Sequence, residues 1–116
     1  MTNVRIPGHI AFEMDARAEV TPDKQIVTFE NNGYPEEVLT YSDIVVNGRK
    51  IANELNKCGV TKGDTFALVM RNHPEFIYSL YASTLIGAVL LPIDPRTKGE
   101  RLKYVLTDSN SKGIIF

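Results

Sequence analysis

The second half of the chain alternates between short apolar runs and longer stretches in which apolar residues recur every three or four positions. Apolar runs are typical of strands and the longer periodicity of helices. In chain order, the expected elements are a strand at 65–70, a helix at 74–86, a strand at 88–93, a helix capped by 97–100 and a strand at 113–116. Because 88–93 shows no alternation with polar residues, we expect it to be buried on both faces of a parallel sheet.

The first half carries a mixed pattern of apolar and polar positions. The expected elements are a helix at 9–20, strands at 25–30 and 36–40 joined through 31–35, and a helix from Thr40 to Gly59. Good helix formers followed by Thr-Pro-Asp favour the first helix and its end. An Asn-Gly pair, which tolerates the positive φ of a tight turn, predicts that the two strands form a hairpin.

The helix after the hairpin has clear start and stop signals. Thr40 and Asp43 have the spacing of a capping box, with Asp in place of the usual Glu, and Gly59 is a C-terminal stop. Its apolar face consists of Ile44, Gly48, Ile51, Leu55 and Cys58. Gly48 on this face indicates the close approach of a neighbour. We interpret Cys58 as a packing residue, because the negative end of a helix disfavours a thiolate.

Two features indicate that the chain needs partner layers. The helix at 74–86 is apolar around most of its circumference, and the chain stops within an apolar strand whose edge would be uncovered. We therefore predict that 1–116 is a single incomplete α/β segment. It comprises a helix, hairpin and helix over 1–64 and a mostly parallel βαβαβ unit over 65–116.

Composition narrows the class of protein. The chain is 43% hydrophobic and 23% charged, with a formal net charge of −1, so it lacks the basic excess expected of a nucleic-acid-binding protein. The apolar stretch 86–93 is far shorter than the roughly 20 residues needed to cross a bilayer. No signal peptide is visible at the N-terminus. Together with the one cysteine, these features predict a soluble cytoplasmic protein without a transmembrane segment.

Candidate binding residues follow from the expected sheet, because ligands of open parallel sheets collect beyond the carboxyl ends of the strands. Arg71 and Arg96 come shortly after two of these strands and could bind a phosphate or carboxylate. The alternative, that both are solvated loop arginines, is favoured because most loop charges do no chemistry. Asn72 is interpreted as a helix cap and Asp94 as a turn residue.

Catalytic and metal sites are not expected within the chain. His73 and His9 lie at no metal-ligand spacing from each other or from Cys58. Glu36 and Glu37 would point to opposite faces of a strand, so they do not form a catalytic pair. Neither glycine-rich nucleotide-binding motif occurs, and the Ser-rich stretch 107–113 precedes a strand instead of following one.

Several short motifs occur in a characteristic order and spacing. They are Leu-Thr-Tyr-Ser-Asp at 39–43, Gly-Val-x-Lys-Gly-Asp at 59–64, Asn-x-Pro-Glu-Phe at 72–76, Ile-Gly-Ala-Val-Leu-Leu-Pro at 86–92 and Asp-Pro-Arg at 94–96. Together they resemble the beginning of the adenylate-forming acyl-CoA synthetase family, with similarity to ligases of fatty acids and of carnitine-like acids. Asp94 departs from this pattern, since many members have Asn there.

The resemblance implies an AMP-forming ligase that uses ATP and Mg²⁺ to activate a carboxylic acid, favoured here as aliphatic, and then transfers the acyl group to coenzyme A. In the family the nucleotide loop and the catalytic lysine come later than this region. We therefore expect the segment alone to be inactive, to bind none of these cofactors tightly and to need the remainder of the synthetase chain. A homodimer is a further expectation.

Two alternatives remain at this point. A free-standing flavodoxin-like or receiver-like binding module would use the same alternation of strands and helices without ligase chemistry. Within the adenylating enzymes, the residues do not exclude a peptide-synthetase adenylation domain or a luciferase-like oxygenase.

Overall fold

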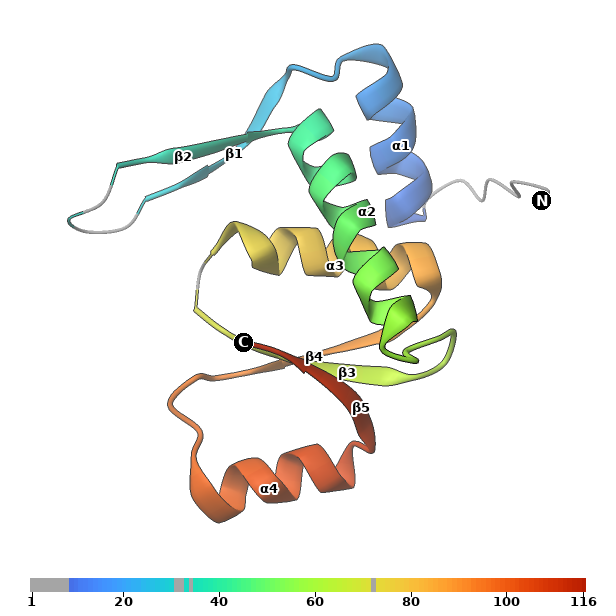
Figure 1. Ribbon diagram of the computed structural model, residues 1–116. Helices are drawn as coiled ribbons and strands as arrows, with labels where there is room; N and C mark the ends of the chain where they lie inside the picture. The colour runs from blue at the N-terminus through green and yellow to red at the C-terminus, as the bar shows by residue number, and fades with distance from the viewer. Residues whose placement is uncertain (1–8, 31–32, 34, 72) are drawn as a thin grey trace.

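The computed structural model describes residues 9–30, 33, 35–71 and 73–116 (Figure 1). The expected turn residues Asn31, Asn32 and Tyr34, the proposed cap Asn72 and the first eight residues lie outside this description. The elements, in chain order, are α1 (Ile10–Val20), β1 (Gln25–Phe29), β2 (Glu37–Thr40), α2 (Tyr41–Lys57), β3 (Thr65–Val69), α3 (Pro74–Ile86), β4 (Val89–Ile93), α4 (Gly99–Asp108) and β5 (Ser111–Ile115).

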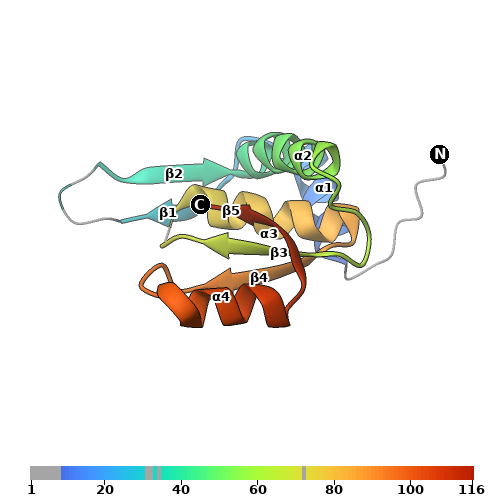
Figure 2. The same ribbon diagram turned by 60° about the horizontal axis from the view of Figure 1, so that its bottom comes forward.

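The strands form an antiparallel β1–β2 hairpin and a separate parallel sheet with the order β4-β3-β5. Phe66 in the central strand is paired with Leu90 of β4 and with Gly113 of β5. The chain moves from β3 to β4 and then back past β3 to β5. Because crossovers between parallel strands are right-handed, this reversal places α3 and α4 on opposite faces of the sheet, as Figures 1 and 2 show. The predicted α/β class and βαβαβ unit are confirmed.

The core lies on the α3 side of the sheet, in two clusters. The first joins α1, the hairpin, α2 and α3 through Ala11, Phe29, Leu39, Ile44, Val45 and Tyr81. The second joins α2 and α3 to the sheet through Ala52, Leu55, Val60, Phe66 and Ala82. Helix α3 is therefore covered by helices on one side and by strands on the other, which explains its apolar circumference. Leu80 and Leu85 remain exposed at 36% and 40%.

The close approach predicted at Gly48 occurs between α2 and α3. A Cβ atom at Gly48 would overlap the ring of Tyr81 and would lie 3.2 Å from the carbonyl oxygen of Tyr78. Only glycine therefore allows the two helices to pack at this distance.

The two expected capping boxes have different outcomes. At α2 the box is confirmed: the Thr40 N–H donates to Asp43 Oδ2 at 2.9 Å, and the Asp43 N–H donates to Thr40 Oγ1 at 3.2 Å. The predicted box at 97–100 is wrong, because α4 begins at Gly99 and its N-cap, Lys98, makes no side-chain cap bond within the described part of the chain. The Thr97 N–H instead donates to the Asp94 carbonyl oxygen at 2.9 Å, which closes a turn before the helix.

Two further predictions about strands need correction. β4 is not buried on both faces: it lies at an edge of the described sheet, and Val89 is 52% exposed. Part of its continuous apolar run is therefore exposed in the described structure. β5 begins at Ser111 instead of residue 113, because Asn110, with φ of 54°, turns the chain directly after α4.

Candidate functional site

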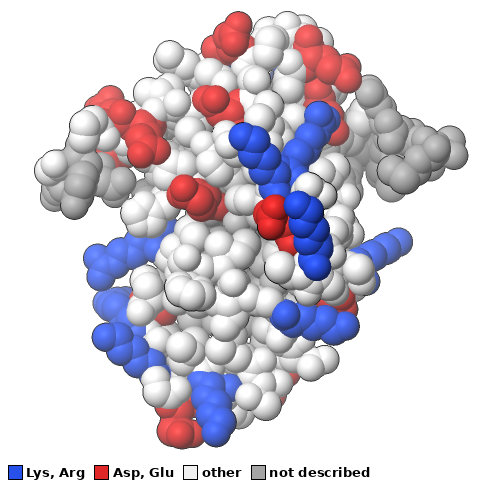
Figure 3. Space-filling model, in the orientation of Figure 1, with Lys and Arg blue, Asp and Glu red and all other residues white. Residues whose placement is uncertain are grey.

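The carboxyl edge of the parallel sheet holds both arginines that the sequence singles out. Arg71 follows β3, and Arg96 follows β4, which lies beside β3 in parallel. Figure 3 shows basic side chains gathered at this edge of the molecule. The tertiary structure therefore brings together two loop residues that are far apart in the sequence.

Arg96 is already engaged by its neighbour in the turn. Its Nη2 lies 2.6 Å from Asp94 Oδ2, and its Nε donates to both carboxylate oxygens of Asp94 at 3.1 Å. The Arg96 backbone N–H also donates to Asp94 Oδ1 at 2.8 Å. The predicted role of Asp94 as a turn residue is confirmed. An incoming anion would have to compete with this carboxylate for Arg96.

The charge at this edge is set by three side chains. Hydrogen bonds from Arg96 hold the pKa of Asp94 at about 2, and the positive charge of Arg71 adds to that shift. The Asp94 carboxylate in turn raises the pKa of Arg96. Among the described residues no ion pair holds the guanidinium of Arg71. The three groups together carry one positive charge in excess, centred on Arg71.

His73 lies beside the two arginines at this edge, and its hydrogen bonds in the described structure are those of the backbone. His73 is the N-cap of α3 and makes no side-chain cap bond there, while its backbone N–H donates to the Arg71 carbonyl oxygen at 2.9 Å. Within the described ranges, no group of three or more His, Cys, Asp or Glu residues could hold a metal ion. The described side chains of this edge can attract an anion and orient it through the positive charge of Arg71.

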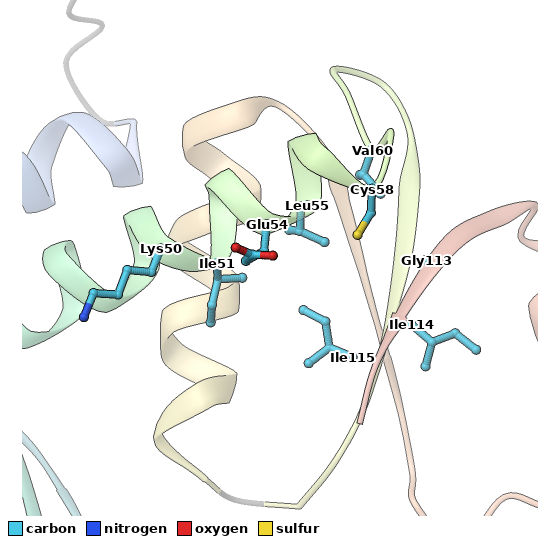
Figure 4. Close-up of a pocket in the computed structure, with 9 residues that line it drawn as sticks. All are labelled: Lys50, Ile51, Glu54, Leu55, Cys58, Val60, Gly113, Ile114 and Ile115. Atoms are coloured by element: carbon cyan, nitrogen blue, oxygen red, sulfur yellow. The ribbon is translucent and has the colours of Figure 1, made fainter.

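A second feature, a groove between α2 and β5, is missed by reasoning from the sequence. It encloses about 390 Å³ and is shown in Figure 4. Its lining is almost entirely apolar and consists of Lys50, Ile51, Glu54, Leu55, Cys58, Val60, Gly113, Ile114 and Ile115. The apolar face of α2 was interpreted as core along its whole length. Ala52 and Leu55 in its last turns are buried, but Ile51 is only partly buried and Cys58 is exposed, and both line the groove beside β5.

Cys58 lies at the end of this groove and corrects one prediction. It was expected to pack, yet it is exposed. Figure 4 shows its sulfur pointing toward the space between α2 and β5. Cys58 lies beside the groove with Leu55 of the same helix face, but its side chain is open to solvent.

A polar network also joins three helices. The Tyr81 hydroxyl of α3 donates to Asp15 Oδ1 of α1 at 2.6 Å, and Arg49 Nη2 of α2 lies 3.2 Å from the same oxygen. Burial and the Asp15 carboxylate raise the pKa of Tyr81 to about 12, so this hydroxyl is protonated at neutral pH. The network contributes to the packing of α1 and lies away from the carboxyl edge.

The helices of the described part of the chain are all too short or too polar to span a membrane.

Comparison with known proteins relates this geometry to a family. A family described as AMP-binding enzyme matches residues 14–116. The chain is 39% identical over 95 residues to 4-coumarate–CoA ligase CCL1 of Humulus lupulus, covering 82% of this chain and 17% of that protein. It is 31% identical over 108 residues to the long-chain-fatty-acid–CoA ligase FadD13 of Mycobacterium tuberculosis, covering 93% and 21%.

A solved structure extends the similarity to the fold. The N-terminal domain of FACL13 from Mycobacterium tuberculosis superposes with a TM-score of 0.79 at 31% identity, covering 91% of this chain and 26% of that one. The chain spans about a fifth of the length of the two curated relatives. These relatives are ligases, and neither is a flavodoxin-like or receiver-like module.

Proposed function

This chain belongs to the AMP-binding enzyme family, and we propose that it forms the N-terminal part of an ATP-dependent acyl-CoA ligase. The observation that supports this most directly is the family match over residues 14–116. Identity to two CoA ligases over more than four-fifths of the chain supports the same proposal. The parent enzyme is the unit to which the activity is assigned.

The proposed reaction has two steps. A carboxylate oxygen attacks the α-phosphorus of ATP, which forms an acyl-adenylate and releases pyrophosphate, with Mg²⁺ balancing the phosphate charge. The thiolate of coenzyme A then attacks the acyl carbon, forming a thioester and releasing AMP. The first step is needed because a free carboxylate is a poor electrophile. The relatives' names include both an aromatic and a long-chain aliphatic acid, so the proposed substrate class is a carboxylic acid of either kind.

Within such an enzyme this chain contributes a scaffold and a charged edge. We infer that Arg71, whose charge is not neutralised by an ion pair among the described residues, attracts an anionic group of a ligand. Arg96 is a weaker candidate, because Asp94 already occupies its guanidinium. The chain by itself is proposed to be inactive, with the groups that bind ATP, Mg²⁺ and coenzyme A supplied by the rest of the enzyme.

A chimera tests this proposal. The chain would replace the 108-residue stretch that it matches in FadD13, and the purified chimera would be given a long-chain fatty acid, ATP, Mg²⁺ and coenzyme A. We expect pyrophosphate release and formation of the thioester. There are two controls: the FadD13 polypeptide that lacks the exchanged stretch, and this chain alone. Neither should release pyrophosphate. A folded but inactive chimera, or pyrophosphate release by the chain alone, would contradict the proposal.

A further inference from the structure

Helix α1 is packed less firmly than the two helices that it contacts. It lies beside α2 and α3, as Figure 1 shows. Ala11 is its one buried residue, whereas α2 and α3 each bury five within the described chain. Its apolar residues Ile10 and Val20 are 46% and 80% exposed. Because apolar stabilisation scales with the area removed from water, α1 gains less from packing than either partner helix.

Asp15 gives α1 a specific polar contact with both partner helices. Its Oδ1 accepts the hydrogen bond from the Tyr81 hydroxyl at 2.6 Å and lies 3.2 Å from Arg49 Nη2. The two contacts differ in strength. The Arg49 side chain is 60% exposed, so water weakens its ion pair, whereas Tyr81 is 1% exposed and its hydroxyl bonds to a charged acceptor. The contact with Tyr81 is therefore the main one that Asp15 makes.

The chain just after α1 is fixed to the start of α2 by backbone hydrogen bonds. The Ser42 N–H donates to the Pro22 carbonyl oxygen at 3.0 Å, and the Tyr41 N–H donates to the Lys24 carbonyl oxygen at 3.3 Å. Between these bonds and α1 lies the C-cap Thr21, whose φ of −135° and ψ of 66° are not helical. Hinges are residues at the end of an element that absorb a change in backbone angles. Thr21 has this position.

We propose that α1 is a hinged strap: residues 10–20 open from α2 and α3 as one unit about Thr21, and Asp15 holds them closed. The proposal does not depend on the proposed function, because it concerns contacts within this chain. An isolated helix of 11 residues is marginal in water, so the opened strap would not stay helical. Its amides should therefore lose protection together and not progressively from the first turn.

Opening of the strap changes the surface that α2 and α3 present. Ala11, with the partly buried Met14 and Ala18, packs into the core cluster that contains Tyr81. Movement of α1 therefore bares part of this cluster, together with the Tyr81 hydroxyl and the Arg49 guanidinium that Asp15 engages. The closed strap thus covers a surface that combines apolar area, a hydroxyl and a positive charge.

Amide hydrogen exchange of the chain, followed by NMR, tests the hinge under conditions where exchange reports the opening equilibrium. Residues 14–20 should exchange at one common rate, at least about tenfold faster than β3, and low urea should hardly change it, because little surface is exposed. The Ser42 N–H, which lies beyond the hinge, should exchange as slowly as the middle of α2. Rates that fall steadily from residue 14 to residue 20 would indicate fraying and overturn the strap. Rates equal to those of β3 would also overturn it.

Three substitutions separate the role of Asp15 from general destabilisation. Asp15→Ala should speed exchange of α1 about tenfold or more, although Ala is the better helix former. Arg17→Ala, at an exposed position of the same helix, should leave this rate within about twofold. Val60→Ala, in the second core cluster, should speed exchange of β3 and leave that of α1 unchanged. Equal rates in Asp15→Ala and Arg17→Ala would overturn the role of Asp15, and faster exchange of α1 in Val60→Ala would overturn its separate opening.

The FadD13 chimera provides the same comparison in a complete enzyme, by mass spectrometry of peptides that cover 10–20 and 65–69. Exchange of α1 together with β3 in an active chimera would overturn the strap and leave the proposed function standing. Faster exchange of α1 in a folded but inactive chimera would support the strap and contradict the proposed function.

Discussion

The hydroxyl of Tyr81 donates a 2.6 Å hydrogen bond to Oδ1 of Asp15, a residue 66 positions earlier in the chain. The bond joins α3 to α1, and Arg49 of α2 reaches the same oxygen. The Tyr81 side chain is 1% exposed and its ring packs directly over Gly48. One tyrosine therefore takes part in both the polar and the apolar contacts that hold the three helices together.

The Tyr81 hydroxyl should contribute measurably to stability. Tyr81→Phe removes one hydrogen bond to a charged acceptor, so we expect the free energy of unfolding to fall by about 1.5–3 kcal/mol. Tyr78→Phe is the control, because its hydroxyl makes no hydrogen bond to the described residues, and its effect should stay within about 0.5 kcal/mol. Urea unfolding measures both. Equal effects of the two substitutions would contradict a specific role for the Tyr81–Asp15 bond.

Stability should fall at high pH because of Tyr81. Its pKa rises from 10.0 to about 12 in the folded protein, so the unfolded state releases this proton first. The contribution is fully present below pH 10 and is lost as pH rises from 10 to about 12, with a slope of at most about 1.4 kcal/mol per pH unit. Unfolding of the protein and of Tyr81→Phe would be compared across this window. The difference between them should shrink as pH rises; a constant difference would contradict the assignment.

The contact at Gly48 should reverse the usual preference for alanine in a helix. Gly48→Ala gains about 1 kcal/mol of helix propensity but forces the Tyr81 ring or the helix backbone to move, and we expect a net loss of about 1–3 kcal/mol. Asn53→Ala, at an exposed position of the same helix, should be neutral or stabilising. Thermal unfolding of the two variants provides the comparison. A stabilised Gly48→Ala variant would mean that the helices separate easily.

The two threonines at the expected capping positions should respond differently to substitution. Thr40→Ala removes the hydroxyl that accepts the Asp43 N–H, and we expect a loss of about 1 kcal/mol. Thr97→Ala should cost less than about 0.5 kcal/mol, because this residue does not cap α4 in the described structure. Chemical denaturation of both variants checks the assignment. A large effect at Thr97 would restore the capping interpretation.

Anion binding at the carboxyl edge should depend on Asp94 and Arg71 in opposite ways. Asp94→Asn removes the carboxylate that occupies Arg96, so inorganic phosphate should bind about two- to fivefold more tightly. Arg71→Gln should weaken binding by a similar factor, and Lys57→Gln, on α2, should leave it unchanged. Phosphate titrations followed by NMR report all three. Equal effects of Lys57→Gln and Arg71→Gln would show that phosphate responds to the net charge of the chain and not to a site at Arg71.

Local patterns in the sequence predicted most of the elements. Apolar periodicity, the capping box at Thr40 and Asp43 and the glycine at 59 depend on residues within a few positions of one another, so these signals can be read without the fold. The false capping box at Thr97 shows the limit of such signals. Its spacing was suitable, but the Thr97 N–H closes the turn with Asp94 instead.

The sequence by itself determined the α/β class, the alternation that makes the sheet parallel, and the motifs that lead to the AMP-binding family. Only the tertiary structure decided that β4 lies at an edge of the described sheet and that Tyr81 donates a hydrogen bond to Asp15. It also decided that Asp94 forms an ion pair with Arg96 near Arg71, and that Cys58 lines a groove. The physical reason is the distance along the sequence over which each interaction acts. Backbone propensity and periodicity act over one or two turns, whereas burial and ion pairing depend on which distant segment arrives as a neighbour.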